Sequence, residues 1–385
     1  MPAFEFSGVG RIIFGRGKFS MAGDLAKSLG RSALVIYNGD ANESRIQTIA
    51  RAGAQIHAIR QRGEPVVSQV DAAVEEARRR ECDCVIGLGG GSAIDAAKAV
   101  AGLLTNGGSA IDYMEVVGQG RKISRPSAPW IAIPTTAGTG AEATRNAVIR
   151  LPEKKFKASI RSEMLLPRIA LVDPDLGADV SPAVTAGSGM DALCQLIESY
   201  TSLGASPMTD ALALAGIPLA AINLPVAFAD GGNLEAREAM SLAALMSGMT
   251  LTNAGLGAVH GFAAPIGANF PIPHGVVCAA LLPHVVHANI HAMRSQAGVE
   301  ASTGLDRYAA IGRIFGGTGE PLDTCVSFIF DLKRQLKIPP LKEFGMDGGD
   351  IAEMVALARR TSSMKFNPVQ LDEDVLGDVL RRAIV

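Results

Sequence analysis

The chain has 385 residues, enough for two domains and a large buried core. Its 36 basic and 38 acidic residues nearly balance, which argues against a protein that binds nucleic acid through a basic surface. Glycine is frequent, with 43 residues, and aromatic residues make up only 5%, a composition typical of an α/β enzyme.

Cysteine usage and the N-terminal sequence predict a cytoplasmic protein. The cysteines are five, an odd number, and Cys82-x-Cys84 lacks the C-x-x-C spacing, so we expect no disulfide framework. The first residues, MPAFEFSGVGRIIFG, lack the charged and apolar regions of a signal peptide. The most apolar stretch, 211–229, contains Pro218 and Pro225, which favours a core helix over a membrane span.

Residues 1–175 alternate short apolar runs with helical patterns. The runs that predict buried strands are 33–37, 54–59, 84–89 and 130–134. This alternation predicts a parallel sheet, whose ligands bind beyond the carboxyl ends of the strands. After the segment IALVDPDL (169–176), Ala- and Leu-rich helical patterns continue to the end of the chain. We therefore predict an α/β domain over 1–175 and an all-helical domain over 176–385.

The segment VIGLGGGSAIDAAKAVA (85–101) predicts a strand, a glycine-rich turn and a helix that starts at Ser92. Gly89, Gly90 and Gly91 let backbone N–H groups approach an anion, and the helix N-terminus adds its positive dipole end. Ser92 and Asp95 have the spacing of a capping box. The turn is a candidate pyrophosphate site, but the spacing departs from G-x-G-x-x-G, and an ordinary strand–helix turn is the alternative.

The next segment, IPTTAGTGAEATRNAVI (133–149), places hydroxyl groups beyond the end of a strand. Such groups can bind ribose or phosphate oxygens, or they can stabilise an ordinary turn, and both interpretations stay open. The residues concerned are Thr135, Thr136, Thr139 and Thr144.

The apolar helical sequence GMDALCQLIESY (189–200) carries Asp191 and Gln195 on one face. Further along, His260 and His274 flank prolines that predict a new helix near His274. If these segments converge, one carboxylate, one amide and two imidazoles form a metal site; the alternative is two histidines satisfied in the core. A second set on one helical face has no carboxylate beside it and is interpreted as a polar stripe: His284, His287 and His291.

Five motifs resemble, in order and spacing, those of the iron-containing (group III) alcohol dehydrogenase family: GGGSAIDAAK, IPTTAGTGAEAT, GMDAL…IESY, GLGAVHGFAAPIGA and PHGVVCAALLPHV. The resemblance covers essentially the whole chain. It implies a Rossmann-like α/β domain that binds a dinucleotide and an all-helical domain that binds metal and substrate, an architecture like that of dehydroquinate synthase. It also implies an enzyme that interconverts alcohols with aldehydes or ketones, using NAD or NADP and a divalent metal between the domains. Fe²⁺ is the expected metal, Zn²⁺ is an alternative, and a homodimer or larger homo-oligomer is expected.

The resemblance assigns roles to individual residues. Asp95, near the nicotinamide, and the histidines His260 and His274 would be catalytic. The metal ligands would be Asp191, Gln195, His260 and His274. The cofactor-binding residues would be Asn38, Asp40, Gly89, Gly90, Gly91, Ser92, Asp95, Thr135, Thr136, Thr139, Thr144 and Lys157.

Several positions depart from the family pattern. Gln195 replaces a histidine and is a weaker ligand for Fe²⁺ or Zn²⁺, so we expect metal affinity to fall by about 10–100-fold and Gln195→His to restore it. Ala264 replaces another histidine, which removes a proton relay or opens space for a larger substrate. Asn38 stands where NAD-preferring relatives have Asp, whereas Asp40, two residues beyond, favours NAD.

Three alternative functions stay open. A metal-independent reductase, like the maleylacetate reductases, would suit Gln195 and Ala264, with His260, His274 or backbone donors polarising the substrate. The others are a non-catalytic nucleotide-binding protein and a lyase related to sugar-phosphate cyclases. We expect a small-molecule substrate, with no nucleic-acid or membrane partner, and an apolar pocket wall that includes Phe262 and Phe270.

Overall fold

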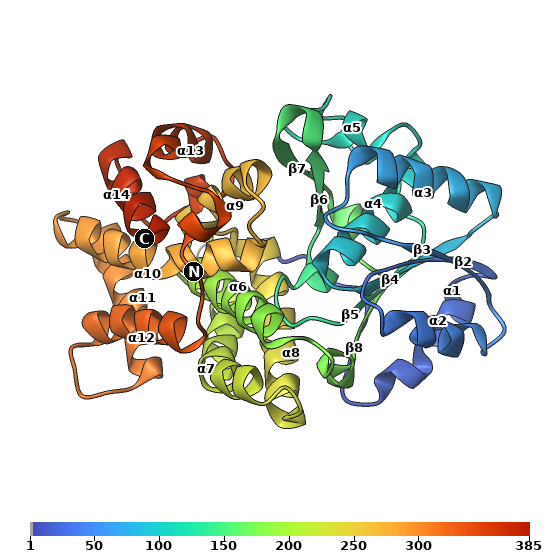
Figure 1. Ribbon diagram of the computed structural model, residues 1–385, viewed down its shortest axis with the longest axis horizontal. Coiled ribbons are helices and arrows are strands. Elements are labelled where there is room, and N and C mark those ends of the chain that lie inside the picture. Colours follow the sequence, from blue (N-terminus) through green and yellow to red (C-terminus); the bar gives the residue numbers. More distant parts are fainter. Residues whose placement is uncertain (1–2) are drawn as a thin grey trace. The chain divides into compact units, whose positions relative to one another are not determined.

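The computed structural model describes residues 3–385, which form two compact units (Figure 1). One unit is Ser7–Val180, and the other comprises Ser181–Val385 together with the described residues before Ser7. The N-terminal sequence, for which no signal peptide is predicted, includes Met1 and Pro2, which lie outside the described residues.

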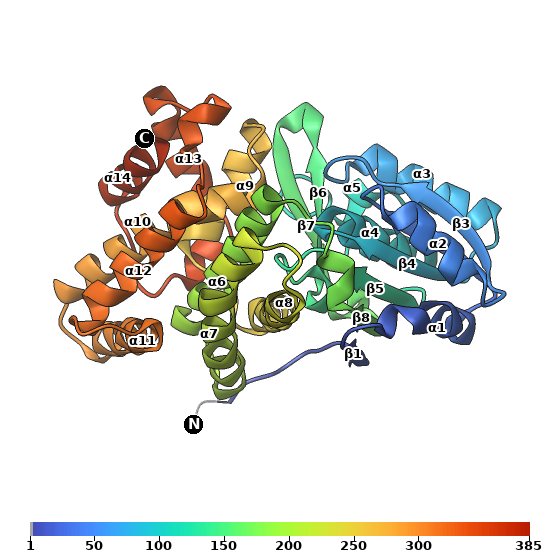
Figure 2. The ribbon, with the colours of Figure 1, turned by 60° about the horizontal axis from the view of Figure 1, so that its bottom comes forward.

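A six-stranded sheet forms the centre of the first unit, with all its strands parallel in the order β1-β8-β5-β4-β2-β3 (Figure 2). The strands are β1 Ile12–Phe14, β2 Ser32–Tyr37, β3 Gln55–Arg60, β4 Cys84–Gly89, β5 Trp130–Pro134 and β8 Ile169–Val172. The predicted parallel sheet is confirmed, and β4 and β5 are buried throughout, as their continuous apolar sequences require. The prediction that 54–59 forms a buried strand is wrong in its burial, because β3 lies at the edge of the sheet and all its residues are partly or fully exposed.

Helices cover both faces of this sheet. One face packs against α1 Ala22–Leu29 and α2 Asn42–Ala50. The other packs against α3 Val67–Arg79, α4 Gly91–Asn106 and α5 Ala110–Tyr113. Trp130 is fully buried in this second core, where its indole N–H donates to the carbonyl of Leu165 at 3.1 Å.

The sequence analysis missed an antiparallel hairpin, formed by β6 Asn146–Leu151 and β7 Phe156–Arg161. In β6 the buried residues Ala147, Ile149 and Leu151 alternate with more exposed ones, and the buried side chains join the core under α3 and α4. This alternation is the ordinary signal of a half-buried strand.

The second unit is helical, with no strand among its described residues, as predicted. Its helices are α6 Pro182–Thr201, α7 Pro207–Ala229, α8 Leu234–Ala254, α9 Ala258–Asn269, α10 His274–Arg294, α11 Val299–Phe315, α12 Pro321–Gln335, α13 Ile351–Ala358 and α14 Glu373–Ile384. α6 packs against α7, α8 and α10, so every residue from Gly189 to Thr201 is buried. Polar side chains along this helix must therefore find partners inside the protein.

By length and composition alone, α7 and α10 could each cross a membrane, and α8 with α9 could add a bent third span. Within the helical unit, however, 78% of the apolar window of α10 is buried, and α7 packs against α6 and α8. α7 contributes one face to the core and leaves residues such as Ile222 and Val226 exposed on the other.

Candidate active site

The strand order reverses at β2, because β3 lies on one side of it and β4 on the other. In open parallel sheets, ligands bind beyond the carboxyl ends of the strands at such a reversal. Asn38 directly follows β2, and Gly89 is the last residue of β4. Two predicted cofactor residues therefore flank the position where a dinucleotide is expected.

The side chain of Asn38 ties the end of β2 to the glycine-rich turn. Its Oδ1 accepts from the backbone N–H of Gly90 at 2.9 Å, and its Nδ2 donates to Ser92 Oγ at 2.8 Å. Gly89 has a φ of 149°, and a Cβ there would lie 2.1 Å from Asn38 Oδ1. Only glycine fits at this position, so the contact between Asn38 and the turn depends on Gly89.

Three of the predicted threonines surround the same turn. The backbone N–H of Thr135 donates to the carbonyl of Gly89 at 3.0 Å. A Cβ built on Gly90 would lie 3.3 Å from Thr136 Oγ1, and one built on Gly91 would lie 2.9 Å from Thr139 Oγ1. Glycine and hydroxyl groups thus meet at the carboxyl edge of the sheet.

The predicted capping box of Ser92 and Asp95 is wrong. α4 begins at Gly91, one residue earlier than predicted, and its N-cap makes no side-chain hydrogen bond. The carboxylate of Asp95 instead accepts from the backbone N–H of Val148 in the hairpin at 3.2 Å, which the sequence analysis did not foresee. Burial raises the pKa of Asp95 to about 6.

A buried ammonium group that the sequence analysis did not single out lies beside Asp95. Lys98 is fully buried, and its Nζ donates to Thr144 Oγ1 at 2.7 Å and to the carbonyls of Ala141 and Asn146 at 2.9 and 2.8 Å. Burial lowers the pKa of Lys98 to about 8. Thr144, predicted to bind cofactor, is itself buried and serves this ammonium group. Lys98 is the last residue of the motif GGGSAIDAAK, so the sequence already placed it beside the glycine-rich turn.

The other two predicted cofactor residues form ion pairs. Lys157 lies on β7, where its side chain is 6% exposed and pairs with Glu64, and burial lowers its pKa. Asp40 is exposed and pairs with Arg60, the last residue of β3. Asp40 therefore places a carboxylate close to the carboxyl edge of the sheet.

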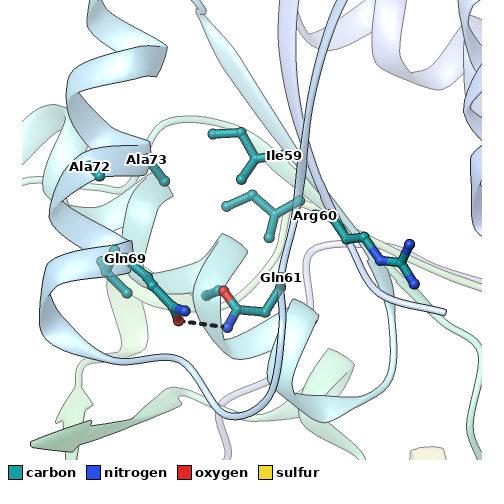
Figure 3. Close-up of a pocket in the computed structure, with 9 residues that line it drawn as sticks. Ile59, Arg60, Gln61, Gln69, Ala72 and Ala73 are labelled. Carbon is teal, nitrogen blue, oxygen red and sulfur yellow. Dashed lines mark hydrogen bonds between the residues drawn. The ribbon is translucent and has the colours of Figure 1, made fainter.

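A separate hollow lies between β2, β3, α3 and α4 (Figure 3). Gln61 and Gln69 face each other across it, with Gln61 Nε2 donating to Gln69 Oε1 at 2.9 Å. Its remaining lining is apolar except for Arg60, and none of the predicted site residues lines it. We assign it no role.

In the helical unit, α6 presents four polar side chains at successive turns of one buried face: Asp191, Cys194, Gln195 and Glu198. Spacings of three and four residues place them in a row. α9 and α10 bring His260 and His274 to this row.

Glu198 caps α9 and orients His260 at the same time. Its Oε1 accepts from the backbone N–H of Val259 at 2.7 Å, while its Oε2 lies 2.6 Å from Nδ1 of His260. Gly257, the N-cap, permits this contact, because a Cβ there would lie 2.8 Å from Glu198 Oε1. A carboxylate on Nδ1 directs the other ring nitrogen, Nε2, toward a ligand.

A close approach of two glycines brings α10 to α6. A Cβ on Gly275 would lie only 2.2 Å from the carbonyl oxygen of Gly187, so the backbones touch there. His274 precedes Gly275 and begins α10, as predicted, and Cys278 follows four residues later on the same face.

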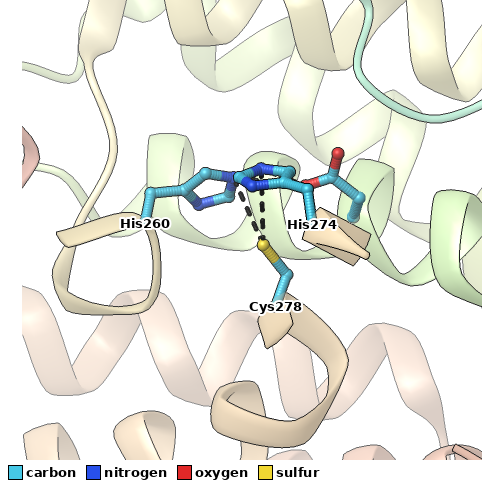
Figure 4. Close-up of side chains that lie close together, drawn as sticks. His260, His274 and Cys278 are labelled. Atoms are coloured by element: carbon cyan, nitrogen blue, oxygen red, sulfur yellow. Dashed lines mark hydrogen bonds and ion pairs between the residues drawn. The ribbon is translucent and has the colours of Figure 1, made fainter. Parts of the chain in front are cut away.

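These elements bring four donor groups together: Asp191, His260, His274 and Cys278 (Figure 4). Each donor atom lies within 4.8 Å of the others. Asp191 Oδ1 is 3.2 Å from His260 Nε2 and 3.6 Å from His274 Nε2. Cys278 Sγ is 3.7 Å from Nε2 of each histidine. The sequence analysis did not single out Cys278, although it lies in the motif PHGVVCAALLPHV.

Gln195 has a different partner. Its Oε1 accepts from Ser247 Oγ on α8 at 2.8 Å, in a fully buried environment. A hydrogen-bonded amide is the ordinary state of a buried glutamine.

The cluster concentrates charge in a buried place. Burial acts to raise the pKa of Asp191, but the neighbouring His274 and His260 hold it below its ordinary value. For His260, burial acts in the opposite direction to Cys278, Glu198 and Asp191, which together hold its pKa well above the ordinary value. Either an imidazolium proton or a divalent cation can neutralise carboxylates in this arrangement, and the donor set of oxygen, nitrogen and sulfur fits a divalent metal ion.

The remaining candidates lie as follows. Ala264 is partly exposed on α9. Phe262 is fully buried in the core, whereas Phe270, which ends α9, is partly exposed. In the predicted polar stripe, His287 and His291 stack with ring centroids 6.4 Å apart. His284 of the same stripe packs edge-on against Phe330 on α12.

Known proteins resemble this chain over nearly its whole length. A family model described as iron-containing alcohol dehydrogenase matches residues 10–174, and one for the C-terminal part of the same family matches residues 185–384. The chain is 37% identical to alcohol dehydrogenase 4 of Saccharomyces cerevisiae over 320 residues, 83% of this chain and 80% of the relative. It is 33% identical to the NAD-dependent methanol dehydrogenase of Bacillus methanolicus, over 97% of both chains. The structure of a 1,3-propanediol oxidoreductase has a TM-score of 0.91 at 31% identity, covering 99% of this chain and 100% of that one.

Proposed function

Because the chain belongs to the iron-containing alcohol dehydrogenase family, we propose that it is an NAD-dependent oxidoreductase that interconverts small alcohols with aldehydes or ketones. The observation that carries this proposal is the convergence of Asp191, His260, His274 and Cys278 from three helices on one buried point. A core without a function would hold apolar side chains here, because burying four polar or ionisable groups costs free energy.

The proposal divides the work between the two parts of the chain. Residues 1–175 bind the dinucleotide, with the glycine-rich turn and the helix dipole of α4 at the pyrophosphate. Residues 176–385 hold the metal and the substrate. Lys98, which is fully buried, and Asp95, which is partly exposed, lie beside each other on α4 and hold the hairpin that follows Thr144.

In the metal site, Asp191, His260 and His274 would hold the ion. When bound, the ion supplies a Lewis acid that polarises the substrate oxygen, and bound NAD supplies the hydride acceptor. Glu198 keeps Nδ1 of His260 engaged, so that only Nε2 is presented. His274, the most exposed member at 38%, marks the side from which a substrate reaches the cluster.

The finer assignments are also proposals. Asp40 gives the enzyme a preference for NAD over NADP, because its carboxylate would repel a 2′-phosphate. The protein works in the cytoplasm as a homodimer or larger homo-oligomer. Fe²⁺ is the ion that the family name implies, and Zn²⁺ is the alternative.

An absorbance assay at the NADH band tests the proposal. The purified protein is offered short aldehydes with NADH or NADPH, after EDTA treatment and after addition of Fe²⁺, Zn²⁺ or Mn²⁺. We expect NADH oxidation that EDTA abolishes and a divalent metal restores. Activity that survives complete metal removal would instead support the metal-independent reductase, which the engagement of Gln195 by Ser247 favours. NADH binding without turnover of any substrate would contradict both.

A further inference from the structure

The distances within the cluster match a specific coordination geometry. With bonds of about 2.0 Å to nitrogen or oxygen and about 2.3 Å to sulfur, a tetrahedral zinc ion separates nitrogen from oxygen by about 3.3 Å and nitrogen from sulfur by about 3.5 Å. The two nitrogen–oxygen separations to Asp191 are 3.2 and 3.6 Å. The two nitrogen–sulfur separations to Cys278 are both 3.7 Å. These four separations fit such a tetrahedron, and the remaining pairs of donor atoms lie within 4.8 Å of each other.

The residue predicted as fourth ligand is occupied elsewhere. The amide oxygen of Gln195 accepts the hydroxyl of Ser247 on α8, whereas Cys278 faces both histidines from α10 (Figure 4). The position of the sulfur therefore makes Cys278 the replacement for the missing imidazole.

A second thiol, that of Cys194, lies beside Nδ1 of His260 and not beside Nε2, the nitrogen that faces the other donors. It is 3.9 Å from Nδ1, the nitrogen that Glu198 already engages at 2.6 Å. An ion there would have to displace this carboxylate contact and would lack the second imidazole. Cys194 is therefore a matched control for Cys278: both are fully buried, and both touch His260.

We propose that Cys278 ligates the metal ion of this enzyme through its sulfur, together with Asp191, His260 and His274, and that this thiolate makes the site selective for Zn²⁺ over Fe²⁺. As sulfur bonds the ion, the thiol proton leaves to solvent. Asp191 and the thiolate then place two negative charges in direct contact with a divalent cation, whereas a glutamine in this place would leave only one. Thiolate is a soft ligand that favours zinc. The inference rests on the proposed metal-dependent function.

Cobalt substitution tests the ligand directly. The full-length protein is stripped of metal and loaded with Co²⁺, and the near-ultraviolet thiolate-to-cobalt charge-transfer band is recorded. We expect this band in the unaltered protein, in Cys194→Ser and in Gln195→Leu, and its loss in Cys278→Ser. Zinc affinity, measured by competition with a chromogenic chelator, should fall by about 10-fold or more in Cys278→Ser and by less than about threefold in the two controls.

Two outcomes would overturn the inference. One is a charge-transfer band that persists in Cys278→Ser or disappears in Cys194→Ser, and the other is a metal-loaded protein that has no such band at all. If Cys278→Ser does not fold, X-ray absorption at the zinc edge of the unaltered protein decides, since it must show one sulfur at about 2.3 Å. A normal charge-transfer band without turnover of any alcohol or aldehyde would contradict the proposed function and support the ligand assignment. Turnover by a protein that has no sulfur ligand would support the proposed function and contradict the ligand assignment.

Discussion

Glu198 holds two groups with one buried carboxylate, the N-terminus of α9 and the Nδ1 atom of His260. Each contact uses a different oxygen, so the geometry of His260 depends on both oxygens being acceptors. A neutral amide offers one acceptor and one donor group and cannot satisfy both contacts.

We therefore predict that Glu198→Gln lowers metal affinity by about 10–100-fold, as for other partners of metal-bound histidines, and destabilises the fold by about 1–3 kcal/mol. Chelator competition and urea denaturation of the metal-free protein measure the two effects. Glu353→Gln, an exposed change on α13, is the control. Unchanged affinity in Glu198→Gln would show that the carboxylate does not orient the ligand.

Asp40 governs cofactor choice in the proposed function, and its partner Arg60 strengthens the argument. The two side chains form an ion pair close to the ends of β2 and β3. Without Asp40, Arg60 loses this partner and can attract a 2′-phosphate instead.

Asp40→Ser should therefore raise kcat/KM for NADPH by about tenfold, equivalent to about 1.4 kcal/mol, and lower that for NADH. The double variant Asp40→Ser with Arg60→Ala should lose most of the gain. Parallel assays with both cofactors check this, and an unchanged ratio of NADPH to NADH use would place the discriminating residue elsewhere.

Glu142 is a buried carboxyl group in the short 3₁₀ turn Ala141–Ala143, and it is 3% exposed. Burial raises its pKa to about 7 from 4.5, with only partial opposition from Lys98. A group whose pKa rises on folding contributes full stability below its unfolded pKa and loses that contribution as the pH rises through the folded value.

Between pH 4.5 and 7, this single group should therefore cost the folded, cofactor-free protein about 3 kcal/mol. Glu142→Gln should remove that loss, so the difference in unfolding free energy between variant and unaltered protein should grow in favour of the variant as the pH rises. Urea denaturation at several pH values measures it. A difference that stays constant across this range would contradict the raised pKa.

The contact between α6 and α10 is made by backbone atoms. With a Cβ on Gly275 placed 2.2 Å from the carbonyl of Gly187, no side chain fits between the helices. Asp191 lies one turn beyond Gly187, and His274 adjoins Gly275, so this contact sets the distance between two of the donors.

Gly275→Ala should push the helices apart, lowering metal affinity by at least about tenfold and stability by about 1–3 kcal/mol, the usual cost of overpacking. Gly348→Ala is the matched control, because a Cβ there meets no atom within 4 Å. Metal titration and thermal denaturation of both variants separate a local effect from general damage. Full affinity in Gly275→Ala would mean that the site tolerates a wider helix spacing.

The spacing of apolar residues predicted most of the strands and helices correctly. Continuous apolar runs predicted β2 to β5, and helical spacing put Asp191 and Gln195 on one face of α6. It could not predict that Gln195 would face Ser247 on α8, because that depends on how helices distant in sequence pack. For the same reason the sequence did not single out Cys278, which lies beside both imidazoles only because of how α9 and α10 pack. The predicted capping box is absent because α4 begins at Gly91, so Ser92 lies inside the helix, where its hydroxyl accepts from Asn38.

The residues of the two candidate sites come from different compact units. All four donor residues lie within Ser181–Val385, and the glycine-rich turn lies within Ser7–Val180. Metal binding should therefore stabilise one unit, and dinucleotide binding the other, because a ligand stabilises the structure that it contacts.

Hydrogen–deuterium exchange on the whole protein can verify this division. Zn²⁺ should slow exchange in α6, α9 and α10 and leave β2, β4 and α4 unchanged, whereas NAD should slow exchange around Gly89 and Asn38. Protection by zinc that spreads evenly over both units would contradict a metal site built from the helical unit alone.

The hydrogen bond between Gln195 and Ser247 also bears on how such a centre evolves. Where α6 carries Gln195 in place of a histidine, the amide binds Ser247 on α8, and replacing either residue alone leaves the other without this hydrogen bond. A histidine at position 195 should therefore also need a replacement of Ser247, and in the proposed ligand set Cys278 takes the place of that imidazole. The histidine and thiolate ligand sets would then differ by at least two coupled substitutions, so neither Gln195→His nor a change of Ser247 alone should convert one into the other.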